Sequence, residues 1–140
     1  YMSIPNLTES TFTLHTTIEN RSLDTVVEQT TAALADQGFG VLNTIDIQAT
    51  MKAKLDKDER PYVILGACHP QMAHQALSAL PSIGALLPCN VVIAENDDQS
   101  ISVSIIDPVP LFSILGRTDM DPIALDVQRR LSAVLEALHN

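Results

Sequence analysis

Basic residues are scarce in this sequence. Eight Lys and Arg stand against 17 Asp and Glu, which leaves a formal net charge of −9. The few cations are scattered along the chain, so they form no basic patch or stripe. Because a field of this sign repels phosphate backbones, we expect no nucleic-acid partner.

Long apolar runs are also missing. The longest stretch near the middle, Ile83 to Ile93, is interrupted by Gly84, Pro88 and Asn90 and is far too short to span a membrane. The first residues, Tyr1 to Leu7, lack the basic start and apolar core of a signal peptide. We therefore expect no membrane partner and a cytoplasmic protein.

Cysteine is sparse as well, with two residues in the whole chain, Cys68 and Cys89. Two are too few for a disulfide framework. In a reducing compartment they are buried thiols, a redox pair or metal ligands, and their spacing does not decide among these. No cofactor is expected from the sequence.

The overall composition of the sequence indicates a globular protein. Hydrophobic residues make up 46% and charged residues 18% of the 140 residues. This apolar content is enough for one core, and the length is typical of one domain. We therefore expect a single domain over residues 1–140.

The pattern of apolar and turn-forming residues predicts the secondary structure. A first helix is expected between an N-cap at Ser22 and a C′ glycine at Gly38. Further helices are expected at residues 49–55, which is short, 70–79 and 121–139. Strands are expected at residues 12–18, 39–47, 62–68, 89–95 and 100–106.

This order, β-α-β-(short α)-β-α-β-β-α, predicts an α+β fold: a two-layer sandwich with one five-stranded sheet. Residues 62–68 are apolar at nearly every position, which predicts a central strand covered on both faces. The polar segment 96–99 predicts a hairpin turn, so the last two strands are expected to be antiparallel neighbours. Pro108 and Pro110 are expected to end the sheet.

Several short strings resemble the domain of unknown function 302 family. The most specific are residues 66–73, GACHPQMA, and residues 86–92, LLPCNVV. The resemblance covers about residues 12–108 and is weaker in the C-terminal helix. It implies a compact α+β fold that is commonly dimeric and has no established biochemical activity. The family usually has Asn where this chain has His69, so the role of that Asn is open here and an imidazole is gained.

The candidate site residues surround the two cysteines. Cys68 and Cys89 lie at the ends of expected strands, beside turns that contain proline, where side chains are both fixed and reachable. Their neighbours His69, Pro70 and Asn90 complete the set of ligand or redox candidates. The simplest alternative is that both cysteines are small buried hydrophobic residues.

A redox role for the cysteines depends on the topology. If the two strands are parallel, the thiols lie at opposite edges of the sheet and no disulfide can form within one subunit. If the strands are antiparallel, the thiols can approach each other. A reversible disulfide, or an oxidised thiolate with a resolving thiol, is then possible.

Two further chemistries are open at the same residues. Cys68, His69 and Cys89 are weak candidates for metal ligands, because no Cys-x-x-Cys or His-x-x-x-His spacing is present. Cys68 precedes an expected helix start, so its thiolate could be stabilised as a nucleophile. Other histidines lie on other elements without a catalytic spacing.

The sequence thus supports two hypotheses. The first is a small homo-oligomeric binding or accessory module, a homodimer whose unidentified small-molecule ligand sits near Cys68, Pro70, Cys89 and Asn90. The alternative is a thiol-dependent redox or metal-handling protein that uses Cys68 and Cys89. The alternative needs at least one reachable sulfur near a partner, whereas the first hypothesis predicts sulfurs that are buried and apart.

Overall fold

A computed structural model describes residues 3–140. Its five strands form one sheet in the order β1-β5-β4-β3-β2, and every neighbouring pair is antiparallel. The strands are β1 (Thr13–Ile18), β2 (Gly40–Asp46), β3 (Tyr62–Cys68), β4 (Cys89–Glu95) and β5 (Ile101–Ile106). The helices are α1 (Leu23–Asp36), α2 (Ile47–Leu55), α3 (Pro70–Ala79), α4 (Pro108–Ser113) and α5 (Asp121–Ala137), with 3₁₀ turns η1 (Pro81–Leu86) and η2 (Thr118–Met120). The predicted α+β order and the antiparallel β4–β5 hairpin are confirmed.

The ends of α1 follow the local signals in the sequence. The Ser22 hydroxyl accepts a hydrogen bond from the Thr25 amide, which satisfies one of the free N–H groups of the first turn. Gly38 ends the helix at a φ of +88°, a left-handed conformation that glycine adopts without a steric penalty. The Phe39 amide then donates to the Leu34 carbonyl, closing the helix C-terminus.

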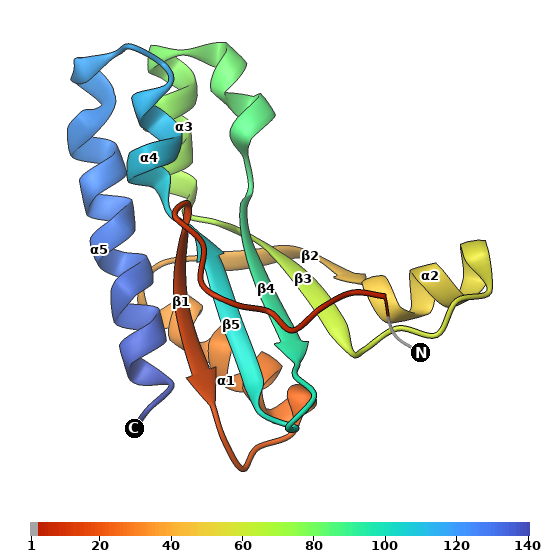
Figure 1. Cartoon of the computed structure of the whole chain (residues 1–140). Coiled ribbons are helices and arrows are strands. Elements are labelled where there is room, and N and C mark those ends of the chain that lie inside the picture. The colour runs from red at the N-terminus through yellow and green to blue at the C-terminus, as the bar shows by residue number, and fades with distance from the viewer. Residues whose placement is uncertain (1–2) are drawn as a thin grey trace.

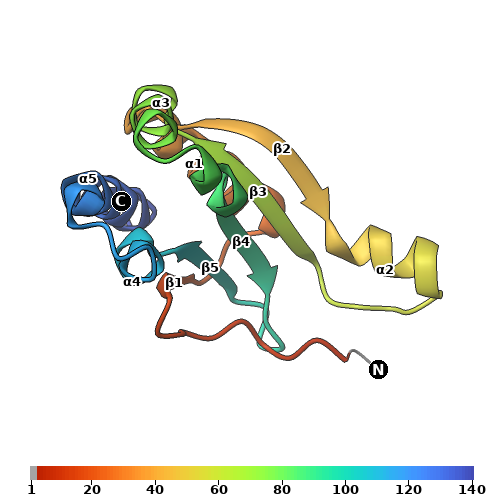
Figure 2. The ribbon, with the colours of Figure 1, turned by 90° about the horizontal axis from the view of Figure 1, so that it is seen from above.

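Two helices cover one face of the sheet, which we call the first face (Figures 1 and 2). Both α1 and α5 turn an apolar stripe towards it, as amphipathic helices do. The core between the layers contains side chains that are almost completely buried, among them Leu34, Leu65, Val91, Ile93, Val103, Ile105 and Leu131. This layer arrangement confirms the two-layer sandwich. None of the helices within residues 3–140 is both long and apolar enough to cross a membrane.

The opposite side of the sheet, the second face, is not covered by α1 or α5. Residues 3–12 cross it as an extended segment, drawn in red in front of the strands (Figure 1). The expectation that residues 62–68 are central and covered on both faces is therefore only partly right. β3 is an interior strand between β4 and β2, but Ile64 on the second face is only half-buried. The apolar residues of β3 thus include several that the helices do not shield.

The β2–α2 region extends away from the body of the molecule (Figure 2). We call residues 40–58, which comprise β2, α2 and the start of the following loop, the arm. β2 is an edge strand, and six of its seven residues are exposed. α2 has no buried residue, although its N-terminus is capped by Asp46, whose carboxylate accepts from the Ala49 amide. The arm thus buries little within its own chain.

At one end of the sheet, α3, η1 and α4 form a small second core with the start of α5 (Figure 1). The sequence did not predict α4, since Pro108 and Pro110 were expected only to end the sheet. Asp107 accepts a hydrogen bond from the Val109 amide and places Pro108 at the start of the helix. Proline is compatible with the first turn because its missing N–H would have no intrahelical partner there.

Candidate functional site

The two cysteines lie at the joined ends of β3 and β4. The strands are antiparallel, and Ala67 is the direct partner of Cys89. Because successive side chains of a strand point to opposite faces, Cys68 points to the second face and Cys89 to the first. Both cysteines are free thiols. A disulfide between them would require the backbone to move, because their side chains leave opposite sides of the sheet.

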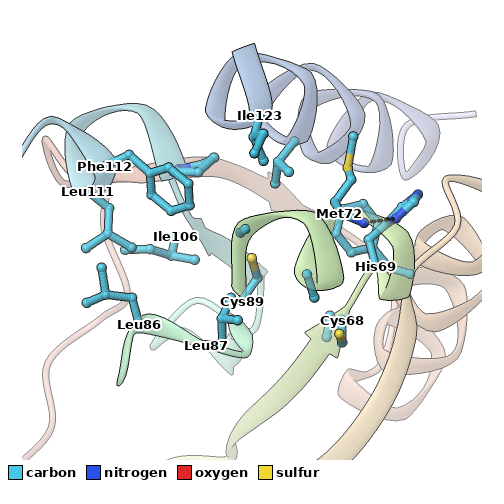
Figure 3. A pocket seen from close by; sticks show the side chains of 16 residues that line it. Cys68, His69, Met72, Leu86, Leu87, Cys89, Ile106, Leu111, Phe112 and Ile123 are labelled. Atoms are coloured by element: carbon cyan, nitrogen blue, oxygen red, sulfur yellow. Dashed lines mark hydrogen bonds between the residues drawn. The ribbon is translucent and has the colours of Figure 1, made fainter. Parts of the chain in front are cut away.

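The Cys89 sulfur points into a cavity of about 40 Å³ at the seam between the two cores (Figure 3). Residues from the sheet end, α3, α4 and α5 line it. Apolar residues dominate the lining, including Phe39, Met72, Leu87, Phe112, Ile123 and Val127. Cys68 and His69 complete the lining where β3 passes into α3. The space holds a group of a few atoms and favours an apolar one.

Burial controls the protonation of Cys89. Desolvation, with a smaller contribution from Cys68, raises the pKa of the Cys89 thiol from 9.0 to about 11. An apolar environment has this effect because it disfavours the charged thiolate. At neutral pH Cys89 is therefore a neutral thiol. Because folding raises this pKa, the unfolded chain releases the Cys89 proton more readily than the folded chain does. The contribution of the buried thiol to the free energy of unfolding is therefore fully present below pH 9 and is lost as the pH rises towards 11.

We expect iodoacetamide to alkylate Cys89 about 100-fold more slowly at pH 8 than an ordinary thiol, because only the thiolate is the nucleophile and the pKa lies about two units higher. The rate should increase about tenfold per pH unit up to pH 11. The measurement uses a Cys68→Ser variant, in which Cys89 is the remaining thiol, with the same variant in denaturant as the control. A folded-state rate at pH 8 equal to the rate in denaturant would show that Cys89 is not protected.

His69 has a structural role in the turn between β3 and α3. Its Nδ1 accepts a hydrogen bond from the Met72 amide at 3.3 Å and caps α3 (Figure 3). This acceptor role requires an Nδ1 that carries no proton. The ring also meets Phe39 edge-to-face, with centroids 5.4 Å apart. Asn is among the best N-cap residues, so His69 performs a task that an Asn at this position would also perform.

The arrangement offers little support for thiol catalysis. Within residues 3–140, no hydrogen bond joins Cys68 to His69, and the imidazole Nδ1 is already used by the helix cap. In the same described part of the chain, no group of three or more His, Cys, Asp or Glu side chains is placed to hold a metal ion. The geometry near Cys89 is instead that of a small cavity with a mostly apolar lining.

The structure separates the five candidate residues that the sequence singled out. Cys68, His69 and Cys89 line the cavity. Pro70 is exposed at the start of α3, and Asn90 is exposed on the second face, where it lines a different hollow. Sequence reasoning missed Phe112, which α4 carries to the cavity. The Asp107-Pro108 pair, which has the same cap-and-proline pattern as His69-Pro70, is the signal that would have found this helix.

Comparisons with known proteins agree with the fold. A family model described as a domain of unknown function, DUF302, matches residues 14–138. The crystal structure of an uncharacterized conserved protein DUF302 from Bacillus stearothermophilus is 25% identical in sequence, with a TM-score of 0.85. The match covers 92% of this chain and 99% of that chain. No curated protein is similar enough to match. The chain therefore belongs to the DUF302 family, whose function is unknown.

Proposed function

We propose that this chain is a non-catalytic binding module that takes a small apolar group into the cavity beside Cys89. The observation that carries the proposal is the lining itself, which combines apolar side chains from α3, α4 and α5 with a neutral thiol. Ligand sites in proteins are commonly concave and mostly apolar, with a few polar groups that orient the ligand. Here the Cys89 thiol is such a group.

The cavity is small, so the ligand is a small molecule or the end of a longer one. A volume of about 40 Å³ exceeds the space that one water needs, which is about 10–15 Å³. Most of the lining is apolar, so water in the cavity would find few hydrogen-bond partners. An apolar group that enters therefore gains contacts without displacing well-bound water.

The binding hypothesis fits these observations better than the thiol-dependent alternative. A redox or metal role needs a reachable sulfur beside a partner. The Cys89 thiol is neutral, and the two sulfur atoms leave the sheet on opposite sides. These features support a role for both cysteines in packing and in shaping the cavity rather than in thiol–disulfide exchange.

We also propose that the protein is a cytoplasmic homodimer that binds no nucleic acid. Two unpaired thiols suit a reducing compartment. The net charge of −9 opposes contact with phosphate backbones. An edge strand with six exposed residues and a helix without a buried residue support self-association.

Xenon tests the cavity directly, since it enters dry apolar cavities. We expect a saturable change in the NMR shifts of the methyl groups of Met72, Leu87 and Ile123 under xenon pressure. Ala73 lines the cavity and is half-buried, so Ala73→Leu should fill it and weaken xenon binding at least tenfold.

Ala79→Leu is the matched control, because it adds the same atoms to an exposed position of α3 and should leave xenon binding unchanged. The absence of a saturable shift at these methyl groups in the unmodified protein would refute the proposal. An undiminished response in Ala73→Leu would also refute it, since the ligand would then be elsewhere.

A further inference from the structure

A groove on the second face adjoins the cavity at Cys89. It has a volume of about 330 Å³, and its lining includes residues from the starts of β1 and β4. Four residues line both spaces, namely Leu86, Leu87, Ile106 and Leu111. Leu86, Ile106 and Leu111 lie together at the side of the cavity that is away from His69 (Figure 3). The groove and the cavity therefore share one boundary at the end of the sheet.

The four residues of this boundary are only partly buried, whereas their neighbours in the sheet, Val91 and Ile105, are completely buried. Side chains with solvent-exposed surface change rotamer within picoseconds to nanoseconds, whereas a close-packed core holds one arrangement. We therefore expect a ligand in the groove to reach the cavity through rotamer changes at the boundary, without a change in the backbone.

Both spaces lack fully charged side chains. Within residues 3–140, no Lys, Arg, Asp or Glu lines the cavity or the groove. An ionised group placed there would lose its hydration without gaining a partner. The net charge of −9 would also repel an anion. The linings therefore favour a ligand that is uncharged along its whole length.

The groove has a polar end at the start of β4. Asn90 is exposed there, and within residues 3–140 its carboxamide makes no hydrogen bond. Its direct partner on β3 is Gly66, and the Asn43 carboxamide oxygen lies over Gly66, in the space that a Cβ would need. Because a carboxamide both donates and accepts hydrogen bonds, these two side chains suit a hydroxyl or a carbonyl group.

The volumes set the length of the ligand. A methylene group is about as large as a water molecule, whose share of liquid volume is about 30 Å³. The groove therefore holds roughly ten such groups, and the cavity of about 40 Å³ holds the end of the chain. A linear aliphatic chain also has the narrow cross-section that a passage between leucine side chains requires.

We propose that the ligand of this protein is a neutral, single-chain amphiphile of the size of a medium-chain alcohol. Its tail ends in the cavity beside Cys89, its chain lies in the groove, and Asn90 and Asn43 bind its hydroxyl or carbonyl head group. This inference rests on the proposed binding function, and it names the class of the ligand and the surface that holds it.

Decanol and decanoate test the head group, because they have the same number of carbons and differ in charge near neutral pH. We expect decanol to bind about tenfold or more tightly than decanoate. Methyl NMR shifts measure binding, with Val92 and Leu111 reporting on the groove and Met72 and Ile123 on the cavity. Decanoate that binds as tightly as decanol would overturn the neutral head group.

The series hexanol, octanol and decanol tests the tail. Affinity should rise about two- to fourfold for each added methylene, where fourfold corresponds to complete burial. An affinity that does not depend on chain length would contradict a chain lying in the groove. Asn90→Ala should lower the decanol affinity about five- to tenfold, as loss of one hydrogen bond does, and leave xenon binding unchanged. An unchanged decanol affinity would exclude Asn90 as the head-group partner.

Two alanine positions separate the groove from the cavity. Ala85 is exposed and lines only the groove, so Ala85→Phe should weaken decanol binding about tenfold or more and leave xenon binding unchanged. Ala73 lines only the cavity, so Ala73→Leu should weaken the binding of both ligands. Ala79→Phe is the matched control, because it adds the same ring to an exposed position outside both linings. Circular dichroism verifies that each variant is folded.

The two ligands distinguish failure of this inference from failure of the proposed function. Xenon binding without decanol binding would overturn the amphiphile and leave the binding cavity in place. A protein that takes neither ligand would refute both. Decanol shifts confined to Val92 and Leu111 would show that the tail does not enter the cavity, and an undiminished decanol affinity in Ala85→Phe would place the ligand outside the groove. Either result would overturn the joined site.

Discussion

Replacing Gly38 by alanine is expected to lower the free energy of unfolding by about 3 kcal/mol. A left-handed residue with a side chain costs roughly 1–2 kcal/mol, and Gly38 has a φ of +88°. A Cβ there would also lie 2.7 Å from the Nε2 atom of His69. The displaced ring would lose its helix-capping bond, worth about 1 kcal/mol, and its edge contact with Phe39. Urea unfolding measures the change.

Two other glycines separate these contributions. Gly116 has a φ of +65° with open space around its Cβ position, so Gly116→Ala should show only the backbone cost of about 1–2 kcal/mol. Gly40 has neither a positive φ nor a neighbour within 4 Å, so Gly40→Ala should change stability by less than about 0.5 kcal/mol. Equal effects of Gly38→Ala and Gly116→Ala would contradict the contact with His69.

Arg60→Ala is expected to destabilise the protein by about 3 kcal/mol, because hydrogen bonds to charged groups contribute roughly 1.5–3 kcal/mol each. Arg60 is buried beside the start of β3. Its guanidinium donates to the carbonyls of Ile4 and Glu95 and to the side chains of Asn6 and Asp97. The substitution leaves these acceptors without their donor and releases the segment that crosses the second face. Urea unfolding measures the loss, and limited proteolysis within residues 3–12 reports the release.

Arg129→Ala is the control for Arg60→Ala. Arg129 pairs with Asp126 on the exposed side of α5, and exposed ion pairs typically contribute below about 1 kcal/mol. An Arg60→Ala protein as stable as Arg129→Ala, with no faster cleavage of the N-terminal segment, would refute the role assigned to Arg60.

The helix ends show how much local structure is readable from the sequence. Ser22 and Gly38 bound α1, and Pro70 begins α3, as the sequence predicts. Each signal acts through hydrogen bonds or dihedral preferences within about four residues, so no distant contact is needed to interpret it. The short helix α4 carries the same kind of signal in Asp107-Pro108.

The relation between the two cysteines shows where sequence reasoning ends. The sequence left parallel and antiparallel strands open, and η1 returns the chain so that β3 and β4 are antiparallel. Antiparallel strands alone do not bring the thiols together. The register pairs Cys89 with Ala67, and an offset of one residue places Cys68 on the opposite face. A one-residue slip would reverse this result, because side chains alternate along a strand.

The sequence by itself determined the α+β class, the order of the strands and most helices along the chain, and the resemblance to a family of unknown function. These follow from periodicity, caps and short strings, all of which are local. Only the tertiary structure decided that Cys89 faces a cavity as a neutral thiol, that the helices leave the second face open, and that the arm projects. Those features depend on strand register and on burial between residues far apart in the sequence, since desolvation and packing arise only when distant segments meet.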